Sequence, residues 1–365
     1  MARRIKPALK HFMLFVLKYS GVLRCSRRWT TRKGFLIIGW HGVSLEDEHK
    51  YFHTLFISPE QFEQRIKFLK NTFQIASLEE CLAQKEAGTI KPGQVVLTFD
   101  DGYYNFLQRA VPILDRYDAP AVNYVVSARM LDARSKPNLV LRDCIYRTNC
   151  TELVADGIGC ERALPLRSSS DRRRAEKQVL KCLDQTPAAD KDAFVNRVGE
   201  ALGIDVGEIR RRRFWTSMTE DEVAELANRN GKFSLQLHSH EHINAVALGD
   251  KLSEDLRLCR SAIEKATGRP ARDFCFPTGL WSHSTWDALQ ENGIRSAVTT
   301  RRGPNFVETH NYNLRRVMDG GANTQLEFEF EVSGIKWLLH SWLHPKAKYN
   351  PSEKLARYRD DKVRY

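Results

Sequence analysis

Two adjacent carboxylates follow an apolar run in the first third of the chain. The run Val95–Phe99 leads directly into Asp100 and Asp101, and Gly102 comes next. Two neighbouring Asp side chains at the end of a buried strand repel each other unless a metal ion or an Arg compensates their charge. Asp-Asp-Gly is also good turn chemistry. The motif alone therefore leaves a catalytic or metal-binding pair and an ordinary turn equally open.

Histidines are concentrated at one point of the sequence. Three of the 11 His residues, His238, His240 and His242, follow the apolar run Phe233–Leu237. The i, i+4 spacing of His238 and His242 places both imidazoles on one side of a turn or helix start, within reach of one ion. Imidazole and carboxylate together suit zinc or another first-row divalent metal. Taken with the carboxylate pair, the cluster predicts a divalent metal site.

Two other apolar runs end in residues of interest. His41 follows the run Phe35–Trp40, and as a lone residue it suits a structural role as well as a catalytic one. The run Phe274–Phe276 ends in Pro277 and Thr278. Such a turn can present a backbone N–H to a ligand, although an ordinary turn is the better interpretation of this stretch alone.

Short apolar strands that alternate with helices must position these residues. Ser58 and Pro59 mark the start of one helix, and others are expected over 253–267 and 286–291. Seven or eight strand–helix units indicate a parallel α/β barrel, whose active site forms at the C-terminal ends of its strands. The four loops are therefore expected to meet at one mouth. The expected strands are 35–40, 73–77, 95–99, 121–126, 233–237, 274–276, 296–300 and, more weakly, 314–318.

One stretch interrupts the barrel pattern. Residues from about 133 to 230 are polar, rich in charge and helix-prone, which predicts a helical insertion within a barrel domain over 34–320. A C-terminal helix and a charged tail are expected over 321–365.

The N-terminal segment, 1–33, is basic and partly apolar. Its apolar run Phe12–Leu17 is far shorter than the roughly 20 residues that span a bilayer, and no signal-peptide cleavage site follows it. A helix that lies on a membrane surface and a helix that packs on the domain are both compatible with this pattern. The expected location is the cytoplasm or the cytoplasmic face of the membrane, and export by an uncleaved N-terminal segment stays open as an alternative.

The chain is basic, with a formal charge of +12 over 365 residues. A basic surface favours anionic partners such as phosphates, acidic glycans or an anionic membrane. No nucleic-acid-binding motif is present, so no nucleic-acid partner is expected. The 8 Cys residues are scattered and form no C-x-x-C pair, which favours reduced thiols over a disulfide framework or a zinc ribbon.

The stretches Thr98–Gly102 and His238-Ser239-x-x-His242 resemble the first two motifs of the NodB-type polysaccharide deacetylases, a family of carbohydrate esterases. The resemblance runs from about Phe35 to Met318, and the helical insertion fits it least well. It implies a distorted (β/α) barrel with a divalent metal, expected to be Zn2+. By this resemblance Asp101, His238 and His242 bind the metal and Asp100 is the general base.

The chain departs from the family at two motifs. Many members carry Arg-Pro-Pro-Tyr in the third motif, with the Arg oriented toward the base, whereas the matching run Cys275–Thr278 has no Arg. The family's C-terminal Leu-x-His motif carries the catalytic acid, for which His340 is one candidate. A circularly permuted branch, the poly-N-acetylglucosamine deacetylases, takes its acid from an N-terminal strand. That arrangement favours His41 over His340, and both remain candidates.

The implied reaction is hydrolysis of the N-acetyl group of an amino sugar in a glycan or a glycan precursor. His41 would protonate the leaving amine, and the backbone N–H of Thr278, beside Pro277, would bind the oxyanion. Trp40, Tyr103 and Trp281 are candidates for stacking on the sugar, although each taken singly suits ordinary packing equally well.

Two other functions fit the same residues. One is a deacylase that acts on a lipid-linked or nucleotide-linked sugar, which the positive charge favours. The other is a degenerate family member that binds glycan without catalysis. The missing Arg of the third motif favours this alternative, whereas the intact set of Asp and His residues argues against it.

Overall fold

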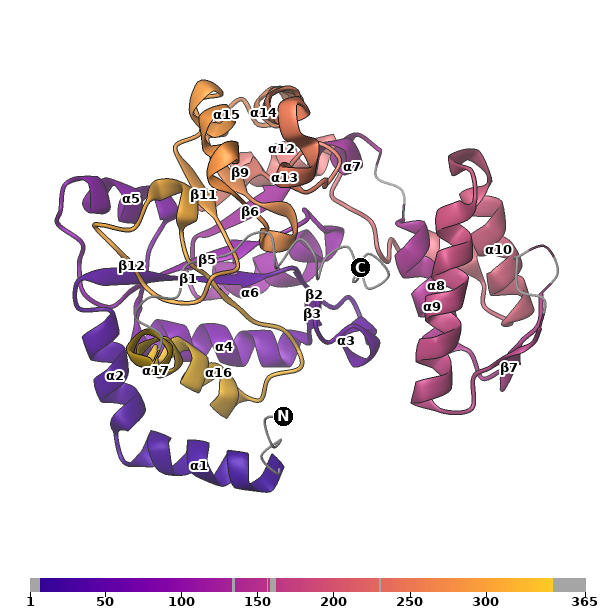
Figure 1. The fold of residues 1–365 in the computed structure, drawn as a ribbon, viewed down its shortest axis with the longest axis horizontal. Helices are drawn as coiled ribbons and strands as arrows, with labels where there is room; N and C mark the ends of the chain where they lie inside the picture. Colours follow the sequence, from indigo (N-terminus) through magenta and orange to yellow (C-terminus); the bar gives the residue numbers. More distant parts are fainter. Residues whose placement is uncertain (1–6, 133–134, 156, 158–161, 230, 344–365) are drawn as a thin grey trace. The chain divides into compact units, whose positions relative to one another are not determined.

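The computed structural model describes residues 7–132, 135–155, 157, 162–229 and 231–343. Contacts divide the chain into two units (Figure 1). Among the described residues, the first comprises 7–131 with 218–343, and the second comprises 132–217. The candidate site residues named above all belong to the first unit.

A parallel sheet forms the centre of the first unit. Its strands lie in the order β11-β10-β9-β6-β5-β1, and all neighbours in this series are parallel. At one edge the short strand β12 (Asn305–Phe306) runs antiparallel to β1. The six parallel strands occur where apolar runs predicted them. They are β1 (Gly34–Trp40), β5 (Gln94–Phe99), β6 (Ala121–Val125), β9 (Phe233–Leu237), β10 (Asp273–Cys275) and β11 (Ser296–Val298).

A short segment near residue 314 links the two edges of this sheet. Leu314 forms a parallel bridge with Val298 at the end of β11. The strand β13 (Val317–Met318) that follows pairs with β1 in parallel. The sheet therefore curls into the predicted distorted (β/α) barrel, and its parallel strands direct their C-terminal ends to one rim. Within the weakly predicted run 314–318, the strand that forms in this link is only two residues long. The expected strand 73–77 is likewise shortened, to β4 (Gln74–Ile75), which pairs with the start of β5.

Apolar side chains cover both faces of the sheet. Along β1, Phe35 and Ile37 belong to the cluster inside the barrel, whereas Leu36, Ile38 and Trp40 belong to the cluster under the outer helices. Strands covered on both faces are nearly continuously apolar rather than alternating, which explains the runs in the sequence.

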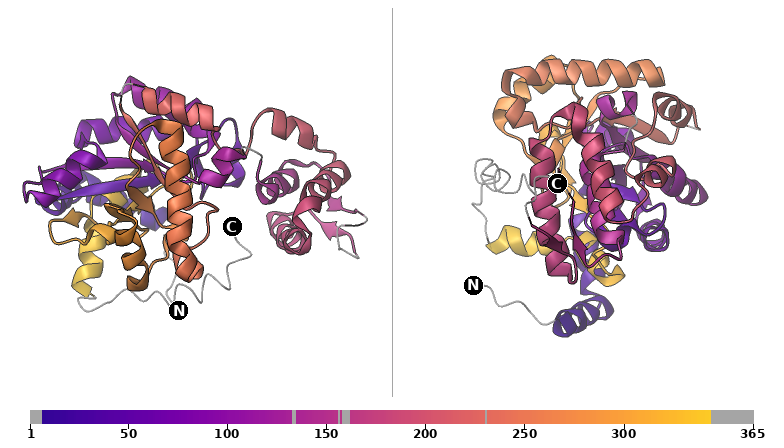
Figure 2. Two further views of the ribbon diagram at one scale, coloured as in Figure 1. Left: turned by 90° about the horizontal axis from the view of Figure 1, so that it is seen from above. Right: turned by 90° about the vertical axis from the view of Figure 1, so that its right-hand side faces the viewer.

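The outer helices begin and end at strong local signals. α4 (Pro59–Thr72) begins with a capping box between Ser58 and Gln61, and α14 (Leu252–Thr267) ends at Gly268 with a φ of 64°. α14 packs along the outer face of the sheet beside β9 (Figure 2). Further elements of the first unit are α3 (Glu48–Tyr51), α5 (Leu78–Glu86), α6 (Val111–Arg116), α7 (Ser127–Leu131), α12 (Glu220–Asn228), α13 (Ala245–Leu248) and α15 (Trp286–Glu291), with the small pair β2 (Gly42–Val43) and β3 (Phe56–Ile57).

Four helices from the two ends of the chain pack on one another in the first unit. They are α1 (Pro7–Tyr19), α2 (Val22–Thr30), α16 (Gln325–Val332) and α17 (Ile335–Leu343). Within the part of the chain that the structure describes, no helix combines the length and the apolar character needed to cross a membrane.

The second unit is mainly helical. α8 (Pro137–Arg147), α9 (Ser169–Gln185), α10 (Lys191–Ala201) and α11 (Val206–Arg211) pack around their own buried residues, with a short antiparallel pair β7 (Glu152–Leu153) and β8 (Leu164–Pro165). This unit takes the place of the insertion expected over about 133–230. Its boundary differs, because α12 packs on α14 and β9 in the first unit.

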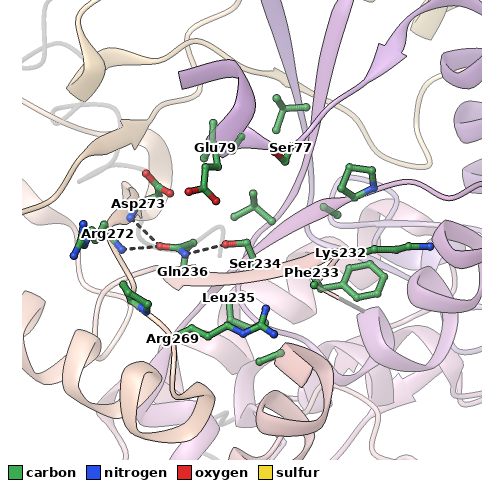
Figure 3. A pocket seen from close by; sticks show the side chains of 18 of the residues that line it. Ser77, Glu79, Lys232, Phe233, Ser234, Leu235, Gln236, Arg269, Arg272 and Asp273 are labelled. Carbon is green, nitrogen blue, oxygen red and sulfur yellow. Dashed lines mark hydrogen bonds between the residues drawn. The ribbon is translucent and has the colours of Figure 1, made fainter. Parts of the chain in front are cut away.

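A cavity of about 370 Å3 lies at the N-terminal ends of the barrel strands (Figure 3). The Gln236 side chain spans it, accepting hydrogen bonds from the backbone N–H groups of Arg272 and Asp273 and donating one to Ser234. Because the strands are parallel, this end of the barrel is opposite the rim that carries the candidate site. None of the candidate site residues lines the cavity.

Candidate active site

One carboxylate and two imidazoles converge at the C-terminal rim of the barrel. Oδ1 of Asp101 lies 3.2 Å from Nε2 of His242 and 3.7 Å from Nε2 of His238. One donor atom from each of the three residues lies within 4.8 Å of the other two. This set of nitrogen and oxygen donors fits a small divalent cation.

The backbone holds the His238 ring in position. Its Nδ1–H donates a hydrogen bond of 2.8 Å to the carbonyl oxygen of Cys275, at the end of β10, which leaves Nε2 toward Asp101. Metal-ligating imidazoles typically use their second nitrogen in this way. Burial lowers the pKa of His238 against the opposing effect of Asp100 and Asp101, so the ring is held in its neutral, ligand-competent form.

The two imidazoles meet through a loop rather than through a helix. Residues 238–242 follow β9, and both Ser239 and His242 adopt positive φ values, 68° and 60°. The rings of His238 and His242 lie 4.9 Å apart. The middle histidine, His240, takes a different role, because its Nδ1 is hydrogen-bonded to Ser127 Oγ at 2.8 Å.

Asp255 of α14 organises this loop. Its carboxylate accepts hydrogen bonds from the Ser239 hydroxyl at 3.1 Å and from the His240 backbone N–H at 3.0 Å. The Ser239 Oγ in turn accepts from the backbone N–H of Ile243. These bonds stabilise a strained turn that carries two candidate ligands, which is a role the sequence analysis missed.

Asp100 is bound by a buried arginine. Nη1 and Nη2 of Arg316 donate to Oδ1 and Oδ2 of Asp100 at 2.7 and 2.8 Å. The guanidinium also donates to the Thr299 carbonyl oxygen at 3.0 Å and contacts Cys275 Sγ at 3.2 Å. Arg316 precedes β13, so the segment that links the barrel edges also supplies the cation beside the predicted base.

The Arg316 charge sets the ionisation of the carboxylate. Burial alone raises the pKa of Asp100, but the charge and the hydrogen bonds of Arg316 outweigh that effect and hold the pKa below its ordinary value. Asp100 is therefore an anion at neutral pH. Asp100, His238 and Cys275 also bring donor atoms within 4.8 Å of one another. Burial raises the pKa of the Cys275 thiol well above its usual range, which makes this a poorer ligand set than the one with Asp101.

The two candidate acids lie in different surroundings. His41 follows β1 at the rim, and its charge contributes to the lowered pKa of Asp100, which places it near the base. Its Nδ1 is buried without a hydrogen-bond partner among the described residues. His340 lies on the exposed side of α17, which packs on α2 near the opposite end of β1. Seven strand residues span about 20 Å, so this geometry favours His41.

The loop after β10 contains a strained residue. Thr278 has a φ of 63°, a conformation that β-branched residues rarely adopt, and its hydroxyl accepts a hydrogen bond from Asn244. Pro277 is buried beside it. Four of the seven positive-φ residues other than glycine in the described chain belong to the site loops: Asp101, Ser239, His242 and Thr278. Such strain is concentrated at functional sites in proteins.

The three aromatic residues considered for sugar stacking are covered by protein. Trp40 has an exposed fraction of 0%, and Tyr103 and Trp281 have 2% each. Their rings contact other aromatic side chains, namely Phe62 and Phe99 for Trp40, Phe56 for Tyr103, and His283 and Trp286 for Trp281. In this conformation they act as packing residues, the alternative that the sequence had left open.

Two basic residues at the site were not singled out from the sequence. Nη1 of Arg129, on α7, lies 3.6 Å from Oδ1 of Asp101. Arg316 lies in the run Leu314–Met318, where a charged residue in an expected strand needs a buried counter-charge. This need for a buried counter-charge is the feature of the sequence that could have identified Arg316 as a partner of one of the site carboxylates.

A family model of polysaccharide deacetylases matches residues 87–157 and 208–297. The matched stretches contain the carboxylate pair, both candidate His ligands and the loop at Thr278, whereas His41 and Arg316 lie outside them. Among curated proteins, the poly-beta-1,6-N-acetyl-D-glucosamine N-deacetylase of Escherichia coli (strain K12) is 35% identical over 91 residues, 24% of this chain. The enzyme of the same name from Staphylococcus aureus (strain MSSA476) is 28% identical over 103 residues, 28% of this chain. The matches span only 13% and 34% of the lengths of these relatives.

Solved structures of deacetylases share the fold. The Streptococcus pyogenes deacetylase PplD, in complex with acetate, aligns with a TM-score of 0.52 and 16% identity, covering 80% of this chain and 94% of that one. A de-N-acetylase from Aggregatibacter actinomycetemcomitans aligns with a TM-score of 0.51 and 16% identity, covering 81% and 99%. At this identity the likeness concerns the fold, and the motif residues come from the sequence matches. In the motif residues of the matched stretches and in the fold, this chain is therefore similar to the NodB-type polysaccharide deacetylases.

Proposed function

We propose that this protein hydrolyses the N-acetyl group of an N-acetylglucosamine-type sugar in a glycan. The observation that carries the proposal is the proximity of two groups at one rim: the donor set of Asp101, His238 and His242, and the ionised carboxylate of Asp100. The names of the curated relatives favour a poly-β-1,6-linked N-acetylglucosamine polymer as the substrate.

The donor set fits a divalent metal ion. The neutral His238 ring, fixed by the Cys275 carbonyl, and the Asp101 carboxylate are the ligand types that zinc accepts, and Zn2+ is our proposed cofactor. A bound divalent ion of this kind polarises an acetamide carbonyl and lowers the pKa of a coordinated water.

The protein's own residues handle the protons. The Asp100 carboxylate accepts a proton from the attacking water, while Arg316 keeps that carboxylate ionised and oriented. The backbone N–H of Thr278 donates to the developing oxyanion. His41 donates a proton to the sugar nitrogen as the bond between the acetyl carbon and that nitrogen breaks, so acetate and the free amine leave.

Arg316 also weakens the case for a degenerate, binding-only protein. The lack of an Arg in the third motif was the argument for that alternative. Arg316 supplies the same charge to Asp100 from a different part of the chain. A catalytically competent site therefore explains the buried pair of Asp100 and Arg316 better than a glycan-binding surface does.

Acetate release tests the proposal. The wild-type protein is expected to release acetate from β-1,6-linked N-acetylglucosamine oligomers, and Asp100→Asn to reduce turnover about 10^2–10^4-fold by removing the general base. Asp118→Asn is a matched control, because Asp118 is an exposed carboxylate paired with Lys232. Lipid-linked and nucleotide-linked N-acetyl sugars are assayed in parallel to separate polymer from precursor. Absence of acetate release from every substrate by the metal-loaded wild type would overturn the proposal.

A further inference from the structure

An exposed apolar surface lies on the helices from the two ends of the chain. Trp29 on α2 and Trp342 on α17 have exposed fractions of 70% and 78%, unusually high for tryptophan. α1, which packs on α2, also exposes apolar side chains, among them Leu9, Phe12, Phe15 and Tyr19. Large exposed apolar patches mark interaction sites on soluble proteins. We call the exposed faces of α1, α2 and α17 the terminal-helix surface.

The folded domain holds this surface in place. Leu14 of α1 is buried, and Lys10 and Lys18 form ion pairs with Glu327 and Glu329 of α16. α2 packs on α1, α16 and α17, so the four helices form one layer (Figure 1). The inward-facing side chains of α1 are therefore engaged, and the remaining apolar side chains face solvent.

The terminal-helix surface has only one sign of charge. α1, α2 and α17 contain no Asp or Glu, and the first acidic residue of the whole chain is Glu46. The acidic residues of neighbouring α16 are paired with cations, Glu331 with Lys336 at 2.6 Å. Arg24 and Arg28 of α2 are exposed. The ion pairs with α16 compensate Lys10, Lys18 and Lys336, so the exposed positive charge beside the apolar side chains comes from Arg24 and Arg28 of α2.

We propose that the terminal-helix surface docks the protein on an anionic lipid bilayer. Bulky apolar residues combined with Lys and Arg are typical of helices that lie in the membrane interface, and tryptophan is enriched at that depth. Basic residues add attraction to anionic headgroups. None of the described helices is long and apolar enough to span a bilayer, which fits a surface attachment. The proposal uses no residue of the candidate active site and stands independently of the proposed function.

Vesicle co-sedimentation of the full chain tests the proposal. We expect binding to vesicles of phosphatidylglycerol and phosphatidylcholine, weak binding to phosphatidylcholine alone, and release as salt rises. Phe12→Ser combined with Trp342→Ser should weaken binding about tenfold or more, because both exposed side chains insert into the interface. Leu258→Ser, at a 45% exposed residue of α14, is the matched apolar control and should bind like the wild type.

The charge contribution has its own matched pair of variants. Arg24→Gln with Arg28→Gln removes two exposed charges one turn apart on α2, and Lys177→Gln with Lys181→Gln does the same on α9. Only the first pair should reduce binding to the anionic vesicles. Size-exclusion chromatography identifies a rival occupant, a second copy of the chain. The proposal would be overturned if the Phe12 and Trp342 changes converted a dimer to a monomer and left vesicle binding unaltered. Equal vesicle binding by all variants would also overturn it.

Discussion

The guanidinium of Arg316 forms a two-point hydrogen bond with the carboxylate of Asp100, at 2.7 and 2.8 Å, inside the barrel rim. Both side chains are almost fully buried. A bidentate pair of this kind fixes the plane of the carboxylate as well as its charge. The base of the proposed reaction therefore depends on a residue outside the family's matched stretches.

Removal of Arg316 should impair both catalysis and stability. Arg316→Gln leaves Asp100 buried without its counter-charge, so we expect a loss of about 3–5 kcal/mol in the free energy of unfolding. Turnover should fall about 10^2-fold or more as the base is misoriented. Urea unfolding and acetate release measure the two effects.

Arg316→Lys separates charge from orientation. Lysine keeps the positive charge but cannot form the two parallel hydrogen bonds. Stability should recover in part while turnover stays low. Arg315→Gln is the adjacent control, since Arg315 lies over the Trp337 ring and should leave turnover unchanged. Full turnover in Arg316→Gln would refute the positioning role.

Metal content should distinguish the three clustered histidines. Chelation is expected to abolish acetate release, and added Zn2+ to restore it. Asp101→Ala, His238→Ala and His242→Ala should each lower the metal content measured by plasma mass spectrometry. His240→Ala should retain metal, because its ring is bonded to Ser127 rather than directed to the donor set. Stoichiometric metal in His238→Ala would show that the ligand set is wrong.

Asp255 should support the metal site without touching it. Asp255→Ala removes the acceptor for Ser239 and the His240 backbone N–H, so the loop relaxes and metal affinity should fall about 10–100-fold. Excess Zn2+ should restore most of the turnover, whereas it cannot rescue Asp100→Asn. The exposed Asp250, at the start of the same helical region, provides the control Asp250→Ala. Unchanged metal affinity in Asp255→Ala would contradict this role.

The identity of the acid can be decided by two substitutions. His41→Ala should lower turnover about 10^2–10^4-fold if it protonates the leaving amine. His340→Ala should have little effect, because His340 lies on the exposed side of α17. A loss of turnover confined to His340→Ala would reverse the assignment.

Thiol reactivity should follow burial. Burial raises the pKa of Cys81, Cys144 and Cys259 to about 12, so these thiols stay protonated and unreactive at pH near 8. Among the seven cysteines that the structure describes, Cys25 is exposed and should react first with iodoacetamide. Peptide mapping after brief labelling checks the order. Rapid labelling of Cys259 in the native protein would contradict the packing around α14.

Local sequence patterns determined much of the architecture. Apolar runs predicted β1, β5, β6 and β9 to within a residue or two, because strands buried on both faces need continuous apolar sequence. Ser58 with Pro59 and the Gly268 stop predicted two helices, since capping depends on neighbouring residues alone. The position of polar residues at strand ends predicted that the candidate site residues would share a rim.

Only the tertiary structure decided which of these residues act on one another. Asp100 and Arg316 are separated by 216 positions, and their pairing depends on the segment that links the barrel edges. The same applies to Asp255, which reaches the His loop from a helix, and to Trp40, whose ring lies under Phe62 rather than at the mouth. Propensity and capping act over a few residues, whereas burial and charge pairing depend on contacts that exist only after the sheet has closed.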